Sequence, residues 1–128
     1  MNTEKYIGKP YKHRGEGQSF DCLSLVISFL NDNGYNLPYD DNKPISEKWY
    51  EDNPNRLIEG LRKYGKRIKS SDIQPFDVIV FEFGGIASHC GVMTDKSHFM
   101  HVRQETTVSI SRLKHYKKYL HSIWRMEV

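Results

Sequence analysis

The sequence lacks the long apolar run that a membrane-spanning helix requires. Such a helix needs about 18 or more consecutive apolar residues, and no stretch of this chain approaches that length. An excess of one charge is also missing, because 19 lysines and arginines face 16 aspartates and glutamates, for a net charge of +3. Nucleic-acid-binding proteins gather more basic residues into a patch or stripe. We therefore expect neither a membrane nor a nucleic acid as the partner.

Cysteine is scarce as well. Cys22 and Cys90 are the two cysteines of the chain, which is too few for a disulfide framework, and their spacing matches no CxxC metal or redox motif. Residues 1–6 hold no apolar core after their charges, so we expect no secretory signal peptide and synthesis in the cytoplasm. What is present is an ordinary globular composition, with 38% hydrophobic and 27% charged residues in a length of 128. This length predicts a single domain over residues 1–128.

The spacing of apolar residues predicts a helix that begins near residue 22. Asp21 is a favourable N-cap and Gly34 a favourable stop, so Cys22 falls in the first turn. The segment 6–20 before this helix is rich in glycine and polar residues and predicts an irregular surface arm. The apolar positions follow the i, i+3, i+4, i+7 stripe of an amphipathic helix, namely Leu23, Val26, Ile27 and Leu30, with Leu25 and Phe29 widening it.

A second, shorter helix is predicted to follow Asn53 and Pro54, which form a cap and a first helical position. Gly65 should end it. The residues before it, 35–52, predict a loop with a short helical turn around Trp49. The apolar face of this second helix consists of Leu57, Ile58 and Leu61.

After Asp72 the apolar period changes from 3.6 to 2, which indicates strands. The predicted strands, in chain order, are residues 77–83, 88–94, 98–103, 107–110 and 122–126. The first is apolar on both faces and should be central, and the second and third should form a hairpin around Asp95-Lys96-Ser97. Helices first and strands afterwards predict an α+β domain, with the helix that carries Cys22 packed on an antiparallel sheet.

The predicted position of Cys22 favours nucleophilic chemistry. A thiol at a helix N-terminus faces unpaired N–H groups and the positive end of the helix dipole, which stabilise the thiolate. The same N–H groups can bind the oxyanion of a tetrahedral intermediate. Cys22 is therefore our candidate nucleophile for acyl transfer.

Two histidines are candidates for the other catalytic roles. With a three-residue hairpin loop, residues pair across the ladder when their numbers add to 192, so His89 and His101 share one face as diagonal neighbours. His89 would then be the general base, and His101 would orient its ring. A two-residue loop would place them on opposite faces instead.

Cys90 follows His89 directly, so on a strand its side chain points to the opposite face. We interpret Cys90 as a core residue that does not belong to the site. A zinc site made of Cys22, His89, Cys90 and His101 fails for the same reason, and its ligand spacing is not that of structural zinc sites. We expect neither a metal nor another cofactor.

Five segments in this order and spacing carry a family resemblance: Gly8-Lys9-Pro10-Tyr11, Asp21-Cys22-Leu23-Ser24, Ile73-Gln74-Pro75-Phe76-Asp77-Val78, His89-Cys90-Gly91-Val92 and Phe99-Met100-His101. The chain resembles the NlpC-type cell-wall peptidases, papain-like cysteine hydrolases of peptidoglycan. The resemblance implies Cys22 as nucleophile, His89 as base and His101 as orienting residue, with Tyr11 and Asp21 beside the oxyanion or the substrate. The implied substrate is the peptidoglycan stem peptide, cut typically between D-glutamate and the diamino acid.

The chain also departs from that family. It has Leu23-Ser24 where the family usually has Ser-Gly, and Phe76 where the family usually has glycine, which leaves the shape of the substrate groove open. A bare domain most resembles the versions found in bacteriophage tails, so we expect phage tail proteins as partners and a virion-associated protein that acts at the cell wall. An acyltransferase or deamidase could use the same site. A non-catalytic tail or wall-binding protein that keeps the fold is the alternative from another class.

Overall fold

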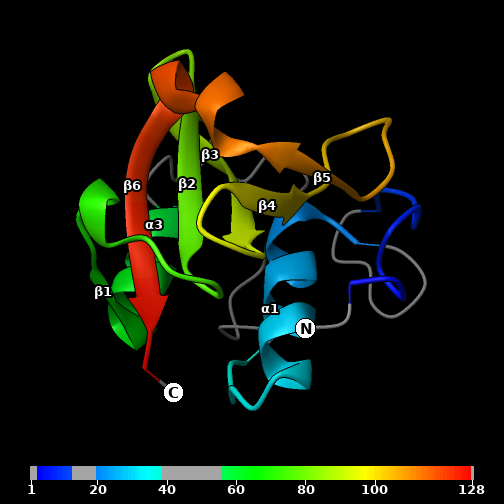
Figure 1. Cartoon of the computed structure of the whole chain (residues 1–128), viewed down its shortest axis with the longest axis horizontal. Coiled ribbons are helices and arrows are strands. Elements are labelled where there is room, and N and C mark those ends of the chain that lie inside the picture. Colours follow the sequence, from blue (N-terminus) through cyan, green and yellow to red (C-terminus); the bar gives the residue numbers. More distant parts are fainter. Residues whose placement is uncertain (1–2, 13–19, 39–55, 128) are drawn as a thin grey trace.

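A computed structural model describes residues 3–12, 20–38 and 56–127 (Figure 1). Two helices, α1 (Cys22–Asp32) and α3 (Arg56–Tyr64), accompany a six-stranded sheet whose neighbouring strands are antiparallel. The strands are β1 (Gly65–Arg67), β2 (Val78–Phe83), β3 (Ile86–Met93), β4 (His98–His101), β5 (Ser109–Arg112) and β6 (Leu120–Met126), in the spatial order β1-β6-β2-β3-β4-β5. Three short 3-10 turns are η1 (Ser70–Asp72), η2 (Leu113–His115) and η3 (Lys117–Tyr119). The predicted α+β class is confirmed.

Helix α1 begins and ends where its capping residues predict. The Asp21 carboxylate accepts a hydrogen bond from the Ser24 N–H at 2.7 Å, and the Asp21 N–H donates to the Ser24 hydroxyl at 3.0 Å. This reciprocal capping box satisfies two N–H groups that the helix itself leaves unpaired. Gly34, with a φ of 98°, takes the left-handed conformation just after the helix.

The N-terminal arm is less superficial than predicted. Tyr6 and Phe20 are only 2% and 1% exposed, and their ring centroids lie 5.6 Å apart in the core. Burial of two large aromatic side chains stabilises the fold more than the polar composition of the arm suggests. Backbone bridges join Pro10 to Thr107 and Tyr11 to Phe20, which hold the arm against the beginning of α1. The prediction of a surface arm is therefore wrong for these buried residues.

The second helix has its predicted apolar face, because all three of its apolar residues are buried: Leu57, Ile58 and Leu61. It ends before Gly65 as expected. The start signal at Asn53 and Pro54 and the turn around Trp49 lie outside the described residues. No described helix combines the length and apolar character that crossing a membrane requires.

The strands follow the predicted pattern with shifted ends and one additional strand; β3 begins two residues early, at Ile86, and β4 ends two residues early, at His101. β2 is central, between β3 and β6, and the β3–β4 hairpin has the predicted register, with Val92 opposite Met100 and Met93 opposite Phe99. β6 begins at Leu120, two residues early, and β5 lies at Ser109–Arg112 rather than at 107–110. β1 was not predicted, because its three residues show no alternation and it exists through pairing with β6.

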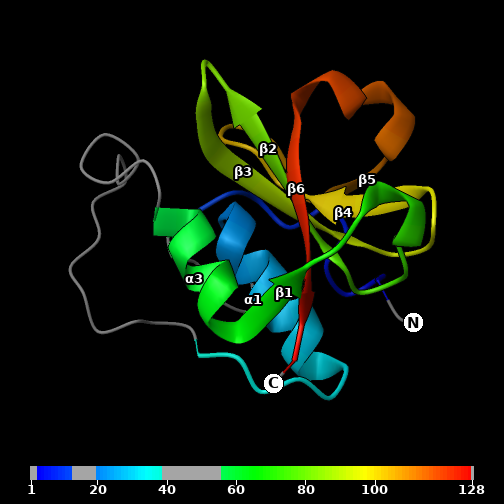
Figure 2. The ribbon, with the colours of Figure 1, turned by 90° about the vertical axis from the view of Figure 1, so that its left-hand side faces the viewer.

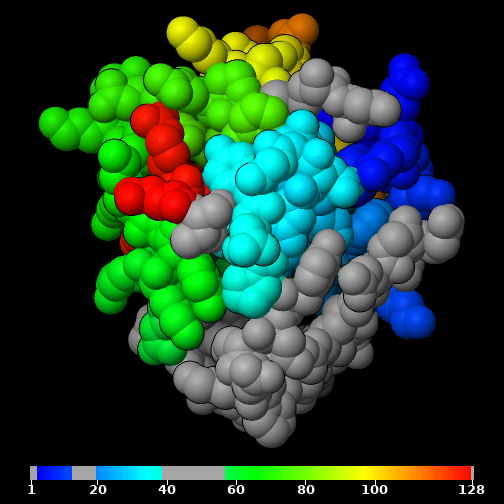
Figure 3. Space-filling view, turned by 90° about the horizontal axis from the view of Figure 1, so that it is seen from below, coloured from blue at the N-terminus to red at the C-terminus, as the bar shows by residue number. Residues whose placement is uncertain are grey.

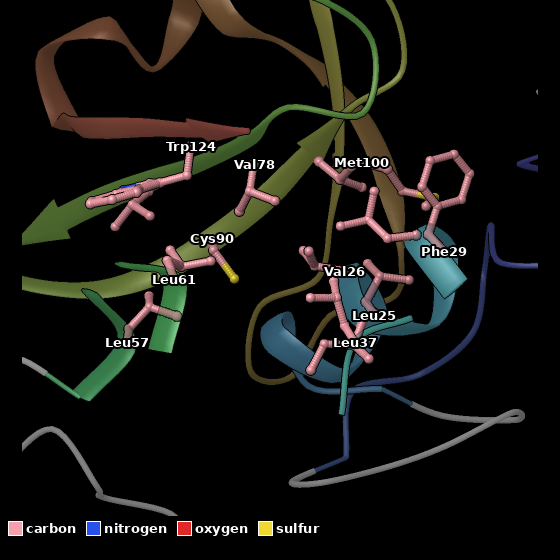
Figure 4. Close-up of a cluster of buried hydrophobic side chains, with 14 of the residues drawn as sticks. Leu25, Val26, Phe29, Leu37, Leu57, Leu61, Val78, Cys90, Met100 and Trp124 are labelled. Carbon is pink, nitrogen blue, oxygen red and sulfur yellow. The ribbon is translucent and has the colours of Figure 1, made fainter. Parts of the chain in front are cut away.

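Alternate residues of the strands enter two separate clusters. The helix-side cluster lies between the sheet and the helices, and includes Leu25, Val26, Leu30, Val78, Val80, Cys90, Met100 and Trp124 (Figure 4). The turn-side cluster lies on the other face and consists of Ile79, Phe81, Met93, Phe99, Leu113 and Ile123. Figure 2 shows α1 and α3 on one side of β6 and the η2–η3 segment on the other. Seen from below, the end of α1 and residues 34–38 lie between the blue N-terminal segment and the green segment that begins with α3 (Figure 3).

A buried ion pair ties the beginning of β2 to the end of β6. Asp77 is 1% exposed, and its two carboxylate oxygens accept hydrogen bonds from the Arg125 guanidinium at 2.8 and 2.9 Å. The Gln74 N–H donates to the same carboxylate at 2.9 Å. A buried carboxylate needs such bidentate pairing, since its desolvation is costly.

Candidate active site

His89 on β3 and His101 on β4 lie in direct contact. His89 Nε2 is 2.9 Å from His101 Nδ1, and the two side chains are 6% and 5% exposed. They occupy the same face of the sheet as the turn-side cluster, where Phe81 stacks on His89 and Phe99 contacts His101. The diagonal arrangement predicted from the hairpin register is the one observed.

Gly91 makes room for this contact. A Cβ at this position would lie 2.8 Å from the Phe99 ring, 3.0 Å from the Met100 carbonyl oxygen and 3.3 Å from the His101 Cβ. Such distances are shorter than ordinary van der Waals contacts, so a side chain would displace β4 and with it the ring of His101. Glycine at this position lets β4 bring His101 to His89.

His101 is held as a neutral imidazole. Burial first, and then the positive charges of His89 and Arg103, lower the pKa of His101 to about 3. Its Nε2 is 2.9 Å from the Ser111 hydroxyl on β5, and the Tyr116 ring meets it edge to face. Sequence reasoning missed Ser111, because the predicted strand 107–110 ends one residue before it, whereas β5 includes it.

The hydrogen-bond pattern fixes where the protons lie when His89 is charged. Protonated His89 donates from Nε2 to His101 Nδ1, so neutral His101 carries its one proton on Nε2 and donates it to Ser111. His89 Nδ1 is then the nitrogen left for another partner. This order is assigned from the network and the neutral state of His101.

Cys22 is close enough to His89 for the two side chains to interact. It is the first residue of α1 and is partly exposed, and His89 is among the groups that shift its pKa. A hydrogen bond from the Cys90 thiol, followed by the hydrogen bond and the charge of His89, lowers the pKa of Cys22 to about 5. Burial and the charge of Asp21 act in the opposite direction. Cys22 is thus largely a thiolate at neutral pH.

The contact with Cys90 corrects the interpretation of that residue. Cys90 is a core residue, as expected, with 0% exposure, but its thiol also touches Cys22. The prediction that it stays apart from the site is wrong. Helix α1 packs against both β3 and β4. Cys22 therefore interacts with two successive residues of β3, His89 and Cys90, whose side chains point to opposite faces.

Asp21 and Tyr11 both lie near Cys22, but they make different contacts. The Asp21 carboxylate is used in the capping box of α1, and its negative charge raises the pKa of Cys22. Tyr11 bridges Phe20, two residues before Cys22, and its N–H donates to the Thr106 carbonyl at 3.1 Å. Both residues therefore border the beginning of α1.

One further charged residue near the histidines, Arg103, was not predicted from the sequence. The Arg103 guanidinium carbon lies 4.8 Å above the centre of the Phe83 ring, and that ring lies 6.2 Å from the His89 ring. Arg103 is exposed, and its charge is felt by His101. The predicted hairpin register, in which residue 103 falls opposite His89, contained this signal.

A comparison with protein families matches residues 8–125 to the model of the NlpC/P60 family. The chain belongs to the NlpC/P60 family. This is a family of cell-wall cysteine peptidases that act on peptidoglycan. A search of curated protein sequences finds no match.

Solved structures of NlpC/P60 proteins share the fold. A lipoprotein-like member from Staphylococcus aureus is 20% identical with a TM-score of 0.64, over 97% of this chain and 38% of that one. A Bacillus cereus member is 20% identical with a TM-score of 0.70, over 94% and 36%. This chain thus spans less than two-fifths of either protein. The NlpC/P60 domain of the peptidoglycan hydrolase SagA is 17% identical with a TM-score of 0.65, over 96% and 92%.

One NlpC/P60 departure has a visible structural consequence. Phe76 has a φ of 75°, a conformation that glycine adopts freely and a bulky residue rarely does. Its ring stacks on Phe29 at 5.8 Å and lies 6.2 Å from Tyr35, so it packs against α1. This departure therefore places an aromatic ring against α1.

The described residues contain no group of three or more histidine, cysteine, aspartate or glutamate side chains placed to hold a metal ion. The chemistry that this NlpC/P60 site can perform is that of a thiolate, an imidazole and backbone N–H groups. Together these supply a nucleophile, an acid and base, and an oxyanion site.

Proposed function

We propose that this chain is a cysteine hydrolase that cleaves an amide bond of the peptidoglycan stem peptide. Cys22 is the nucleophile, His89 the general base and acid, and His101 the residue that orients His89. One observation carries the proposal: Cys90 and His89 together lower the pKa of Cys22 to about 5, and this same His89 has its Nε2 2.9 Å from His101 Nδ1. Nucleophile, base and orienting group in one line are the arrangement that acyl transfer through a covalent intermediate requires.

The reaction follows from the proton positions. The Cys22 thiolate attacks the amide carbonyl carbon, and protonated His89 gives its Nδ1 proton to the leaving amine. A thioester remains on Cys22. Water, deprotonated by His89, then releases the acid product and restores the thiolate. His101 stays neutral throughout and keeps the His89 ring in place through its acceptor Nδ1.

We place the oxyanion of the tetrahedral intermediate at the beginning of α1. The first N–H groups of a helix have no intrahelical acceptor and carry the positive end of its dipole. We assign the N–H of Cys22 to the developing oxyanion. The carboxylate of Asp21 would repel a negative charge and already caps α1, so its part is to hold Cys22 in the first turn. We assign Tyr11, whose backbone bridges Phe20 next to the beginning of α1, to contact with the substrate.

The bond we propose lies between D-glutamate and the diamino acid. A γ-linked D-glutamyl residue keeps its α-carboxylate free, close to the amide that is cut. Arg103 supports this choice, since it is an exposed cation held over Phe83 next to His89. A guanidinium there can pair with that carboxylate, which an amidated stem peptide lacks.

Two synthetic stem peptides test both the cleaved bond and the role of Arg103. They are identical except that the α-carboxyl of D-glutamate is free in one and amidated in the other. Mass spectrometry of the products identifies the bond. We expect cleavage by the wild type and none by Cys22→Ala. Arg103→Gln should lower kcat/KM for the carboxylate peptide about five- to tenfold and leave the amidated peptide unchanged.

Arg62→Gln removes an exposed arginine from α3 and is the matched control, with no expected effect on either peptide. Cleavage of neither peptide by the wild type would contradict the proposed bond. Equal losses on both peptides in Arg103→Gln would contradict the role of Arg103 alone. An amine acceptor that replaces water in the product would identify a transferase.

Association with a bacteriophage tail stays a prediction. Immunoblotting of purified virions would test it. A Cys22→Ala protein that supports full biological activity would instead favour the structural tail or wall-binding role.

A further inference from the structure

The two cysteines of this chain meet, although 67 residues lie between them in the sequence. Cys22 opens α1, and Cys90 lies within β3 opposite Val80. Cys22 packs against the helix-side cluster that contains Cys90, and the interaction of the two thiols lowers the pKa of Cys22 and raises that of Cys90. Figure 4 shows the Cys90 side chain leaving β3 on the side that α1 covers. The proposed hydrolysis uses Cys22 and gives Cys90 no step.

The two thiols differ in the properties that matter for oxidation. Cys22 is partly exposed and lies at the positive end of α1, which favours its thiolate. Cys90 is fully buried, and the neighbouring Cys22 together with burial raises the pKa of its thiol. A dissolved oxidant therefore meets Cys22 first. The oxidised sulfur then has a second thiol within contact.

We propose that Cys22 and Cys90 are a reversible redox pair, in which a hydroperoxide oxidises Cys22 and Cys90 closes a disulfide that switches the site off. The Cys22 thiolate attacks one oxygen of the hydroperoxide, the O–O bond breaks, and the other oxygen leaves as an alcohol, or as water from hydrogen peroxide. Cys22 is then a sulfenic acid. The Cys90 sulfur attacks it, the S–O bond breaks, and hydroxide leaves with the Cys90 proton as water. Two thiols have lost two electrons to the hydroperoxide.

The geometry explains why this disulfide would abolish activity. His89 and Cys90 are successive residues of β3 and point to opposite faces. A Cys22 sulfur bonded to Cys90 is drawn toward the helix-side cluster and away from His89 Nδ1. It also has no thiolate with which to attack. A dithiol reductant would break the bond and restore both thiols.

The geometry also explains a protective effect. A sulfenic acid that finds no thiol is oxidised further to sulfinic acid, which thiols do not reduce. Cys90 captures the sulfenic acid before a second hydroperoxide arrives, because it already touches the sulfur. We therefore expect reversible inactivation of this protein. A catalytic cysteine without a second thiol nearby would instead be oxidised irreversibly.

The test treats the reduced protein with about five equivalents of hydrogen peroxide at pH 7, since a sulfinic acid takes up two oxygen atoms from two peroxide molecules. The remaining thiols are then blocked, and masses are measured before and after dithiothreitol. For the wild type we expect a loss of about 2 Da, a peptide pair that links Cys22 to Cys90, and full reversal. For Cys90→Ser we expect a gain of about 32 Da at Cys22, as sulfinic acid, that dithiothreitol does not reverse. Circular dichroism checks that this variant is folded.

A second variant tests whether Cys90 reacts with peroxide in the absence of Cys22. Cys22→Ser leaves Cys90 alone in the core, and we expect its thiol to resist the same peroxide in the folded protein. The proposal would be overturned if Cys22 of the wild type formed sulfinic acid as fast as Cys22 of Cys90→Ser and no linked peptide appeared. A disulfide between two copies of the chain would overturn it as well. All these measurements are masses, so their outcome does not depend on whether the protein hydrolyses peptidoglycan.

Discussion

The two faces of the sheet are built from the same strands and differ in nearly everything else. The helix side of β2 and β3 presents aliphatic residues such as Val78, Val80 and Val92, closed over by α1 and α3. The turn side presents aromatic rings, Phe81 and Phe99 among them, around two buried histidines. A shift of one residue along a strand therefore separates the part of the molecule that stabilises the fold from the part that holds the dyad.

This difference shows where each face can tolerate change. The helix side has the larger apolar cluster, and its burial is the main source of stability. The turn side keeps His89 and His101 out of water, which costs stability unless their nitrogens are paired, and they are paired with each other and with Ser111. Substitutions on the two faces should thus separate stability from activity.

His89→Ala on the turn side should have the largest effect. Without the base and acid, kcat/KM should fall about 10³-fold or more, because general acid–base catalysis contributes on that scale. Alkylation of Cys22 by iodoacetamide at pH 6 should also slow, since His89 stabilises the thiolate. Hydrolysis of the stem peptide and peptide mapping measure the two effects. Activity within tenfold of the wild type would refute the assigned role.

Leu30→Ala on the helix side should do the opposite. Leu30 is fully buried in α1, two turns from Cys22, and its truncation should lower the free energy of unfolding by about 3 kcal/mol. Urea unfolding measures this loss. In the fraction that stays folded, kcat should equal that of the wild type. A strongly reduced kcat in a fully folded sample would show that the two faces are coupled.

The next prediction concerns the pH dependence of stability. The pKa of His101 is lowered to about 3 in the folded chain, so below pH 6.5 the unfolded chain binds a proton that the folded chain does not. Stability should therefore fall as the pH drops from about 6.5 toward 3, with about 2 kcal/mol lost through this group at pH 5. His101→Asn should remove this part of the loss, while the contribution of Cys22 is shared by both proteins.

Urea unfolding of both proteins at pH 7 and pH 5 gives the comparison. The quantity that matters is the difference between the two pH values within each protein, since the substitution also changes stability at pH 7. Equal losses in the two proteins would mean that His101 titrates normally.

The sequence predicted those parts of the site that depend on local spacing. The contact between His89 and His101 follows from a three-residue loop and the period of a strand, and the position of Cys22 follows from the cap at Asp21. These features are set within about a dozen residues of chain. The central position of β2 followed from its apolar character on both faces.

The features that escaped prediction depend on where distant segments meet. The interaction of Cys22 with Cys90 depends on how α1 packs against β3, and alternation along a strand carries no information about that packing. The three residues of β1 are a strand through their pairing with β6, far along the chain. The burial of Tyr6 likewise depends on α1, whose Phe29 meets its ring.

The smallest expected effect concerns Ser111, which supports His101 on the turn side of the sheet. Its hydroxyl accepts the proton of His101 Nε2, at 2.9 Å, and so holds the tautomer in which Nδ1 can accept from His89. Ser111→Ala should lower kcat about fivefold with KM unchanged, as the loss of one neutral hydrogen bond of about 1 kcal/mol implies, and should lower the free energy of unfolding by a similar amount. Ser111→Thr should restore kcat, because it keeps the hydroxyl. Ser109→Ala is the matched control, since Ser109 is exposed on the same strand. If both alanine variants have wild-type kcat, the chain of hydrogen bonds that supports catalysis ends at His101.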